Sequence, residues 1–386
     1  MVNVIYPLAS STWGPEEVQA IQNVIASDMY TMGGAVKQFE KEYAKHFGHD
    51  HAVMTNSGSS ANLLMLSLLK LKYKLTGDII VPAVGWSTSY FPVNQNGFKL
   101  NFVDVDPQTY NIDTTKIEQA ITPNTCAIMA INLLGNPCDF DTIYEIADKH
   151  NLFVIEDNCE SMGAKYNDRY TGGHGIIGTQ SFFFSHHMQT MEGGMVTVDN
   201  QEDADWLRSL RAHGWCRDLS PDNPLFQKTG SWKDNFTFVT PGYTVRPLEM
   251  SGAVGSEQLK KWDNIMSARM KNKEHFFSKF GDEKYLKLQK TQGESSWFSF
   301  GCICTGALAG RRDELVTALT EAGIQSRPLA SGNWLTQPVM SMLDYTATGD
   351  YSGADLIEDE GFFVGNGMQD VTQGIDAMYE VIQKLV

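Results

Sequence analysis

The sequence predicts an α/β protein with a large domain around a mainly parallel sheet and a smaller C-terminal α+β domain. Short apolar runs alternate with helix-like stretches, and strands separated by helices form parallel sheets covered by helices on both faces. The chain has 386 residues, 42% of them hydrophobic, so it can bury a large core and exceeds the usual size of one domain. We place the large domain at residues 1–250 and the small domain at 251–386.

The first helix is predicted from Pro15 to Ala26, because proline suits the first helical position and two glutamates occupy the first turn. Apolar and β-branched runs bounded by turn residues then predict the strands of the large domain. These strands are His51–Thr55, Asp78–Val81, Leu100–Val105, Cys126–Asn132, Phe153–Glu156, Ser181–Phe184 and Met195–Val198.

Helical periodicity also marks Ala61–Lys70, and a longer stretch from Glu249 to Phe280 leads out of the large domain. In the small domain we expect a strand within Trp297–Thr305 and helices near Asp313–Ala322 and Gly374–Leu385.

Charge and composition exclude several classes of protein. The net charge of −16 argues against a nucleic-acid partner, because neutralising phosphates requires clustered lysine and arginine. The amino terminus lacks the pattern of a signal peptide, and no apolar run reaches transmembrane length. We therefore expect a cytoplasmic protein with no membrane partner.

Six cysteines are scattered over apolar and loop segments, and disulfides are not expected in the cytoplasm. The pair Cys302 and Cys304 suggests a metal site, but alternate residues of a strand simply share one face. The further clustered thiols that an iron–sulfur cluster needs are absent from the sequence. We interpret the pair as core residues and expect no metal.

The segment from Ser181 to Val196, SFFFSHHMQTMEGGMV, contains the most informative motif. It resembles the DegT/DnrJ/EryC1/StrS sugar aminotransferases, in which Ser-Phe is followed after three residues by a Schiff-base lysine and then by an acidic residue and Gly-Gly. Here His186 stands at the position of that lysine, six residues before Glu192. In this family the same replacement marks 3-dehydratases, which remove a sugar hydroxyl instead of installing an amine.

The resemblance implies the PLP-dependent aspartate aminotransferase fold (fold type I) and covers nearly the whole chain. The segments that carry it are YPLASSTW (Tyr6–Trp13), SGSSANLLM (Ser57–Met65), IIVPAVGWSTSY (Ile79–Tyr90), NLLGNP (Asn132–Pro137), EDNCESMGA (Glu156–Ala164), RAHGW (Arg211–Trp215), VRPLEMSGA (Val245–Ala253) and GESSWF (Gly293–Phe298).

Ser57, Gly58 and Ser59 lie between a predicted strand and a predicted helix, where free amides suit a phosphate. Such a segment is more often only a turn and helix cap. The resemblance makes it the clamp for pyridoxal 5′-phosphate (PLP), with Ser181 adding a hydroxyl. The resemblance makes Trp86 the aromatic side chain that covers the face of the cofactor ring. Without the resemblance, a buried packing role would be the preferred interpretation of this tryptophan.

Asp157 ends the predicted strand FVIED. In the family a carboxylate at this place keeps the pyridine nitrogen of the cofactor protonated, so that the ring withdraws electrons. The resemblance also places Glu160 near the ring hydroxyl.

Imidazole cannot form the Schiff base of a lysine, yet its pKa near neutrality makes His186 a competent proton carrier. The resemblance implies that His186 takes a proton from C4′ of pyridoxamine 5′-phosphate (PMP) joined to a 4-keto sugar, and assists loss of the C3 hydroxyl. Ammonia is released, and glutamate restores PMP by half-transamination. The adjacent His187 is an alternative base, but we interpret it as a polar turn residue.

The remaining candidates concern the substrate and a second subunit. Active sites of the family are shared across a homodimer, and most relatives contact the cofactor phosphate through an asparagine where this chain has Thr244. Arginine pairs well with a diphosphate, and whole-chain resemblance favours a GDP-linked sugar. The candidates for binding it are His213, Trp215, Arg246, Arg327, Ser331 and Asn333.

Two other functions stay open at this point. The first is a conventional aminotransferase that uses another lysine and keeps the nitrogen in an amino sugar. The second is a catalytically inactive relative that binds a nucleotide sugar.

Overall fold

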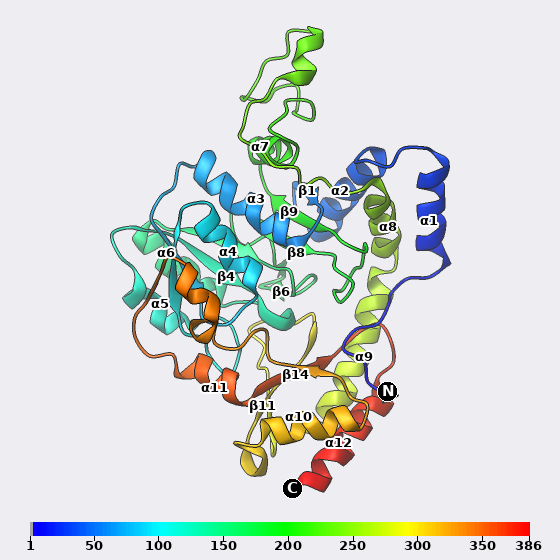
Figure 1. Ribbon diagram of the computed structural model, residues 1–386, viewed down its shortest axis with the longest axis vertical. Coiled ribbons are helices and arrows are strands. Elements are labelled where there is room, and N and C mark those ends of the chain that lie inside the picture. Colours follow the sequence, from blue (N-terminus) through cyan, green and yellow to red (C-terminus); the bar gives the residue numbers. More distant parts are fainter. Residues whose placement is uncertain (1–2) are drawn as a thin grey trace.

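The computed structural model describes residues 3–386 and contains two main sheets, one in each lobe (Figure 1). The helices are α1 (Pro15–Ala26), α2 (Gly34–Phe47), α3 (Gly58–Leu71), α4 (Ser87–Gln95), α5 (Thr114–Ala120), α6 (Phe140–His150), α7 (Gln201–Arg211), α8 (Glu249–Lys260), α9 (Trp262–Phe280), α10 (Arg312–Glu321), α11 (Ser352–Glu360) and α12 (Thr372–Leu385). The short 3₁₀ helices are η1 (Leu133–Gly135), η2 (Trp232–Phe236), η3 (Gly306–Leu308), η4 (Trp334–Thr336) and η5 (Pro338–Met342).

The strands are β1 (His51–Thr55), β2 (Asp78–Pro82), β3 (Lys99–Val103), β4 (Thr125–Ile131), β5 (Phe153–Asp157), β6 (Lys165–Tyr166), β7 (Arg169–Tyr170), β8 (Gly178–Ser181), β9 (Gly194–Val198), β10 (Leu286–Leu288), β11 (Ser299–Cys304), β12 (Ser326–Arg327), β13 (Tyr345–Ala347) and β14 (Gly361–Gly365).

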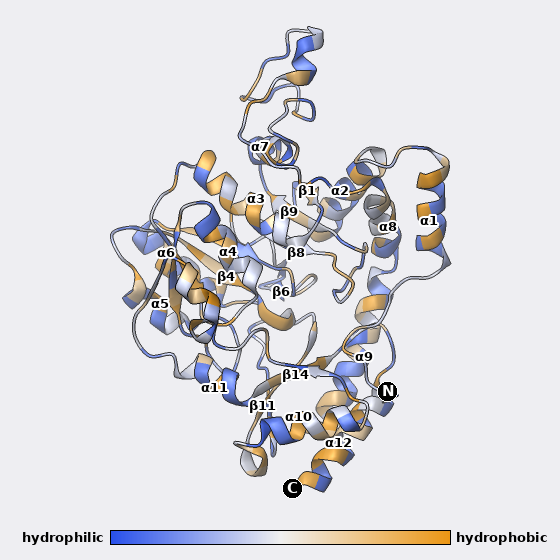
Figure 2. Cartoon of the chain, viewed as in Figure 1, coloured by the Kyte–Doolittle hydropathy of each residue, from blue (hydrophilic) through white to orange (hydrophobic). Residues whose placement is uncertain are grey.

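The large sheet has the order β1-β9-β8-β5-β4-β2-β3-β13. Every neighbouring pair is parallel except the two that involve β9, which runs antiparallel to both β1 and β8. Helices cover its two faces (Figure 1), and much of the orange, apolar colouring of the large lobe lies where the helices face the sheet (Figure 2). The predicted mainly parallel sheet is therefore confirmed.

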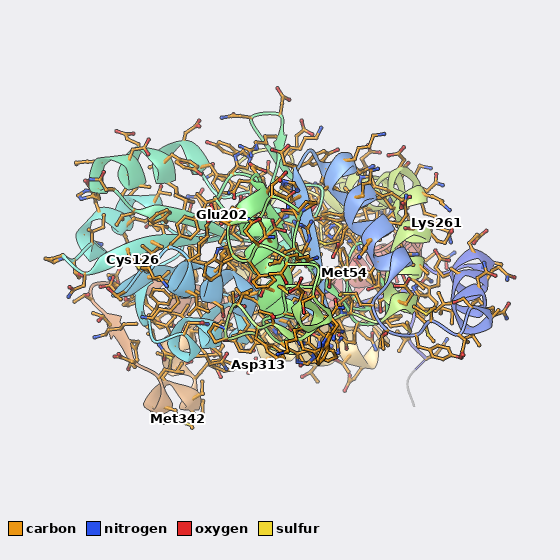
Figure 3. The ribbon with its side chains drawn as sticks, turned by 90° about the horizontal axis from the view of Figure 1, so that it is seen from above. Met54, Cys126, Glu202, Lys261, Asp313 and Met342 are labelled. Carbon is orange, nitrogen blue, oxygen red and sulfur yellow. The ribbon has the colours of Figure 1, made fainter. Side chains whose placement is uncertain are left out.

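The small lobe is an antiparallel sheet, β10-β11-β14-β12, packed with helices α9, α10 and α12 around its own core. Cys302 and Cys304 of β11 are buried in that core, as the core interpretation predicted. Seen from above, Met54 of β1 lies deep in the molecule, whereas Met342 of η5 projects from its edge (Figure 3).

A single cut at residue 250 is too simple a description of the two lobes. Helix α8 packs on α1 and α2 of the large lobe, and the C-terminal strand β13 returns to pair with β3. At the other end of the chain, Tyr6 is buried in the small-lobe core and donates a hydrogen bond to the Gly365 carbonyl at 2.8 Å. Both lobes are thus built from segments far apart in sequence.

Two predicted elements differ from the observed ones. The predicted strand from Ser181 to Phe184 is wrong, because β8 ends at Ser181, where it pairs with Gly194, and the chain then turns. The predicted helix from Glu249 to Phe280 is two helices that break at Lys261, whose ammonium is held by Glu17 of α1 at 2.7 Å. None of the helices within residues 3–386 is long and apolar enough to cross a bilayer.

The buried carboxylate of Asp104, just after β3, fastens the returning C-terminal segment to the large sheet. Its oxygens accept the amides of Gly353 and Ala354 at 3.0 and 2.8 Å, and its Oδ2 lies 2.7 Å from the ammonium of Lys116. An unpaired buried donor is costly, so this carboxylate should be hard to replace.

We expect Asp104→Asn to lower the free energy of unfolding by about 2–3 kcal/mol, because the amide supplies fewer acceptors and no charge. The control is Asp350→Asn, which faces the same Lys116 at 3.5 Å from an exposed position and should lower the stability far less, because solvent screens an exposed pair. Urea unfolding followed by circular dichroism measures both. Equal losses would show that Asp104 does not anchor the segment.

Candidate active site

The carboxylate of Asp157 lies buried at the carboxyl end of β5, the edge at which open parallel sheets bind ligands. Its Oδ2 accepts hydrogen bonds from Asn62 Nδ2 of α3 at 2.8 Å and from Ser89 Oγ of α4 at 2.6 Å. The amide of Cys159 donates to Oδ1 at 3.1 Å. Neither Asn62 nor Ser89 was among the sequence candidates; both lie within the segments that carry the family resemblance.

The amino terminus of α3 lies against the end of β8. Ser57 caps the helix by accepting the Ser60 amide at 3.1 Å. A Cβ on Gly58 would meet the Cβ of Ser181 at 2.6 Å, and one on Gly194 would meet the carbonyl oxygen of Ser57 at 2.3 Å. Only glycine permits this packing, which brings Ser57, Gly58 and Ser181 together as predicted. The cap uses the Ser60 amide, and the amides of Gly58 and Ser59, which have no intrahelical acceptor, are the ones that suit an anion.

Trp86 precedes α4, and 53% of its surface is exposed, which contradicts the alternative interpretation of a buried packing tryptophan. The backbone beside it is fixed, because the Gly85 carbonyl accepts hydrogen bonds from Ser331 Oγ at 2.6 Å and Trp334 Nε1 at 2.9 Å. An exposed indole on a fixed backbone is suited to cover a flat ligand.

Glu160 follows β5 and accepts the amide of Leu134 in η1 at 3.1 Å. Burial raises the pKa of this carboxyl to about 7, and the neighbouring charge of Asp157 adds to the rise. The Glu160 carboxyl therefore exchanges its proton near neutral pH, which suits a group placed beside a ligand hydroxyl.

His186 lies in the turn that follows β8, half-buried, with its ring 5.1 Å from that of Phe298 in an edge-to-face arrangement. Burial, with the nearby positive charge of Arg269, lowers the pKa of His186 to about 3. The pKa near neutrality that the sequence suggested is therefore not found in the cofactor-free protein. The imidazole is neutral at physiological pH and has a free lone pair with which to accept a proton.

His187 lies in the predicted turn, but its side chain is fully buried. Its Nε2 donates to the Ser296 carbonyl at 3.1 Å, which leaves the proton on that nitrogen, and its Nδ1 has no partner among the described residues. Burial holds the pKa of His187 well below its ordinary value. His187 thus holds the turn in place, while the half-buried His186 remains more accessible to solvent than its neighbour.

A segment that we call the arm, residues 213–247, projects beyond α7 at the top of Figure 1. At its base Thr244 Oγ1 lies 2.6 Å from His213 Nδ1, and the His213 and Trp215 rings are 4.5 Å apart. The guanidinium of Arg217 lies 3.8 Å from the Trp215 ring centroid and that of Arg246 lies 5.7 Å from it. The structure therefore groups four predicted residues and adds Arg217, whose local sequence gave no signal.

The C-terminal candidates behave differently from one another. Arg327 of β12 is exposed and forms no ion pair with any residue in 3–386. Ser331 fixes the backbone beside Trp86, as described above. Asn333 is buried, caps η4 through Leu335, and donates to Asp355 at 2.7 Å. These contacts give Asn333 a structural role and do not support the prediction that it binds substrate.

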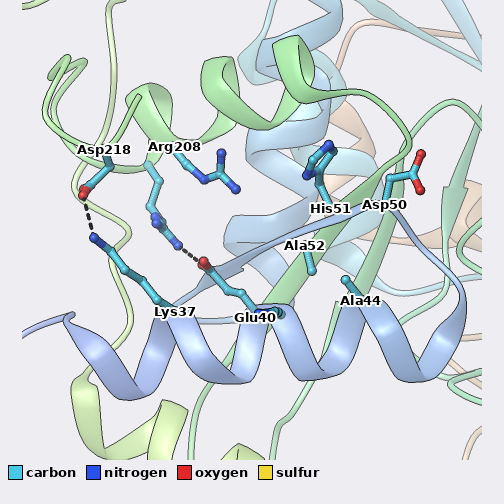
Figure 4. A pocket seen from close by; sticks show the side chains of 10 residues that line it. Lys37, Glu40, Ala44, Asp50, His51, Ala52, Arg208 and Asp218 are labelled. Carbon is cyan, nitrogen blue, oxygen red and sulfur yellow. Dashed lines mark hydrogen bonds and ion pairs between the residues drawn. The ribbon is translucent and has the colours of Figure 1, made fainter. Parts of the chain in front are cut away.

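A surface cavity of about 380 Å³ lies away from these residues, between α2 and α7 (Figure 4). Lys37 pairs with Asp218 across it at 3.5 Å, and Arg211 pairs with Glu40. Because its charges are largely paired with one another, it lacks the convergent free groups of an active site.

The residues at the strand ends fit PLP. A carboxylate with fixed donors on both oxygens, a glycine-packed helix start for a phosphate and an exposed indole converge at one edge of the sheet. Ser57, Gly58, Ser59 and Ser181 would hold the phosphate. Trp86, Asp157 and Glu160 would surround the ring.

Comparison with known proteins gives a consistent result over the whole chain. Residues 12–368 match the model of the DegT/DnrJ/EryC1/StrS aminotransferase family. The chain is 48% identical over 391 residues to GDP-4-keto-6-deoxy-D-mannose 3-dehydratase of Yersinia pseudotuberculosis, covering 100% of this chain and 99% of that protein.

Two solved structures are similar in shape as well as sequence. The E. coli GDP-4-keto-6-deoxy-D-mannose 3-dehydratase with bound hydrated PLP has a TM-score of 0.95 at 46% identity and covers 99% of both chains. A histidine mutant of GDP-4-keto-6-deoxymannose 3-dehydratase with bound GDP-perosamine has a TM-score of 0.94 at 46% identity, covering 98% of this chain and 100% of that one.

The pKa of Glu160 gives a pH-dependent prediction for the cofactor-free protein. The folded pKa of about 7 exceeds the ordinary 4.5, so the stability contributed by the protonated group is full below about pH 4.5 and is lost as pH rises through 7. Glu160→Gln never ionises. We therefore expect the free energy of unfolding of Glu160→Gln, measured relative to that of wild type, to rise by on the order of 1 kcal/mol from pH 5 to pH 8.

Thermal unfolding at the two pH values measures this gain. Glu321→Gln, on the exposed end of α10, controls for the loss of one negative charge. A Glu160→Gln variant that gains nothing relative to wild type at pH 8 would contradict the raised pKa.

Proposed function

The chain belongs to the DegT/DnrJ/EryC1/StrS aminotransferase family, and from this we propose that it is a GDP-4-keto-6-deoxy-D-mannose 3-dehydratase. The observation that carries the proposal is His186, which stands at the position of the Schiff-base lysine in an otherwise retained cofactor frame. Similarity over the full length to enzymes of that name supports the substrate.

The cofactor, as PMP when loaded, supplies a primary amine for the sugar ketone and a ring that withdraws electrons from the reacting carbons. Asp157 serves this chemistry by holding a negative charge at the strand end, where Asn62 and Ser89 fix its Oδ2. Trp86 limits the access of water to the site from one face.

His186 provides the base. It accepts the proton from C4′, because its imidazole is neutral at physiological pH, and it cannot form a covalent anchor. The imidazolium that results can return a proton to the departing C3 hydroxyl, which leaves as water. One histidine thus acts in turn as base and as acid.

The products are a 3-deoxy-4-keto sugar nucleotide and ammonia. Because the nitrogen leaves, an amino donor must restore the amine form after each turnover, and the family resemblance points to glutamate. The same binding residues serve both half-reactions.

We assign the sugar nucleotide to the cationic and aromatic residues around the arm. His213, Trp215 and Arg246 are grouped at its base together with Arg217, and a planar guanidinium suits a diphosphate. Exposed Arg327 is a further candidate. The GDP-perosamine bound to the similar solved enzyme supports a guanosine nucleotide.

The enzyme works as a homodimer whose arm completes the site of the partner. Three aromatic side chains of the arm, Trp232, Phe236 and Phe238, are 73%, 60% and 58% exposed, although apolar rings of this size are normally covered. On a projecting segment, a second copy of the chain would supply that cover. Thr244 would then contact the cofactor phosphate of the partner through its hydroxyl.

Subunit complementation tests the shared site. His186→Asn and Arg246→Ala homodimers should each be inactive, whereas refolding a 1:1 mixture should restore roughly a quarter of wild-type activity, because half of the dimers gain one complete site. His186→Asn mixed with Asp157→Asn, both changed outside the arm and both expected to be inactive alone, is the control. No recovery in the first mixture would show that each chain builds its own site.

The function is tested by incubating the enzyme with PLP, glutamate and GDP-4-keto-6-deoxymannose, and by following ammonia and sugar mass. We expect loss of the C3 oxygen together with ammonia release. A product that keeps the nitrogen would identify an aminotransferase, and an unchanged sugar would identify a binding protein without activity. Either result overturns the proposal.

The role of His186 is tested by restoring the family residue. His186→Lys should bond covalently to PLP, seen as a mass increase that borohydride reduction makes permanent, and should lose dehydration by about a hundredfold or more because a lysine bonded to the cofactor no longer offers the free base that His186 provides. His187→Lys is the matched control and should not bond to PLP. Full dehydratase turnover in His186→Lys would show that His186 is not the base.

A further inference from the structure

Arg269 of α9 is a buried arginine, 2% exposed, that forms no ion pair with any described residue. Its Nη1 donates to the carbonyls of Trp297, Phe298 and Asn366 at 3.2, 3.1 and 2.9 Å, and its Nε has no partner among residues 3–386. The other fully buried arginine, Arg211, is by contrast neutralised by Glu40. Burying a charge without a counter-ion costs folding free energy, so a buried unpaired arginine suggests a functional role.

Two of the three carbonyls, those of Trp297 and Phe298, belong to a strained turn between the two lobes, which we call the Trp297 turn. Trp297 has a φ of +47°, a left-handed conformation that is costly for a bulky residue. Its carbonyl also accepts Asn366 Nδ2 at 2.8 Å, while the Phe298 amide donates to the Leu134 carbonyl at 3.2 Å. Arg269 and Asn366 therefore hold this turn from the small lobe, and η1 holds it from the large lobe.

The Trp297 turn contacts both His186 and His187. The Phe298 ring lies 5.1 Å from that of His186 and 5.8 Å from that of His187, and the Ser296 carbonyl accepts the His187 Nε2 proton. The backbone conformation at Trp297 thus decides where the Phe298 ring stands and which nitrogen of His187 is protonated. The first contact packs directly on the His186 ring, and the second holds the residue that follows His186 in the chain.

We propose that Arg269 is a positioning residue for His186, acting by holding the Trp297 turn so that Phe298 supports the imidazole in its reactive orientation. This inference rests on the proposed function, in which His186 carries the proton. The positive charge of Arg269 also has an electrostatic effect. It contributes to the lowered pKa of both His186 and His187, which keeps the two rings neutral. A counter-ion on Arg269 would cancel that effect.

Histidine labelled with ¹³C at Cε1 reports the His186 ring in the cofactor-free protein, independently of any activity. We expect one sharp His186 resonance in wild type, identified by its loss in His186→Asn. In Arg269→Met the resonance should broaden or double, and its titration should move toward 6.5, the ordinary value. Arg269→Lys, which keeps the charge and a donor, should restore most of the wild-type signal.

Phe298→Leu tests whether the Phe298 ring orients His186 while Arg269 is left unchanged. This variant decides between the outcomes if Arg269→Met does not fold. It should disturb the His186 resonance, whereas Phe300→Leu, a buried small-lobe ring stacked on Phe276, should not. An unchanged His186 resonance in Phe298→Leu, or an equal disturbance in Phe300→Leu, overturns the proposal.

Turnover supplies the second readout. Per folded site, Arg269→Met and Phe298→Leu should lower kcat by about tenfold to a hundredfold with KM for the nucleotide sugar unchanged within about twofold, as expected for a misplaced catalytic group. If the protein has no dehydratase activity at all, the proposed function fails while the resonance test still decides the role of Arg269. A loss explained entirely by unfolded protein would reject positioning.

Discussion

The candidate site depends on one constraint, the burial of the Asp157 charge at the end of β5. A buried carboxylate is tolerated only when donors satisfy it, and the donors here come from α3 through Asn62 and from α4 through Ser89. Asn62 in turn accepts a hydrogen bond from Thr179 of β8 at 2.6 Å. The same contacts therefore fix the start of α3, the loop that carries Trp86 and the strand that leads to the histidine motif.

The two adjacent histidines show how one replacement can change the chemistry of a motif whose other residues are kept. His187 is buried and hydrogen-bonded to the Ser296 carbonyl, so it holds the turn. His186 packs on Phe298 and keeps a neutral ring available for a proton. A lysine at this position anchors the cofactor as well as moving protons, whereas histidine keeps only the proton transfer. The residues around His186 would hold a cofactor whose ring would supply electron withdrawal, and a base that leaves the cofactor unanchored would suit loss of a hydroxyl without retention of the nitrogen.

Local sequence signals were sufficient to predict many of the helices and strands. Helix α1 has its predicted bounds because Pro15 and two glutamates mark its start, and β5 ends at Asp157 as its apolar run indicates. The end of β8 was misplaced, because the aromatic residues after Ser181 have strand propensity but leave the sheet for a turn. Strand β13 is three residues long and pairs with β3 across the chain, so it has almost no local signal.

Within the candidate site, the motif frame pointed to Ser57, Asp157 and His186, and each of them ends or follows a strand of the large sheet. The arrangement of partners could not be predicted in the same way. Asn333 resembles a loop residue in sequence, yet tertiary contacts make it a cap, and Arg269 lies in an ordinary helical pattern. Burial and hydrogen bonding across the two lobes decide such roles, and neither is visible along the chain.

The central claim is that His186 moves the C4′ proton, and labelled cofactor measures this directly. With PMP deuterated at C4′ and the 4-keto sugar nucleotide, we expect wild type to transfer one C4′ deuteron to solvent within a single turnover. His186→Asn should retain that label while still binding PMP. Washout of the label at the wild-type rate in His186→Asn would contradict the account.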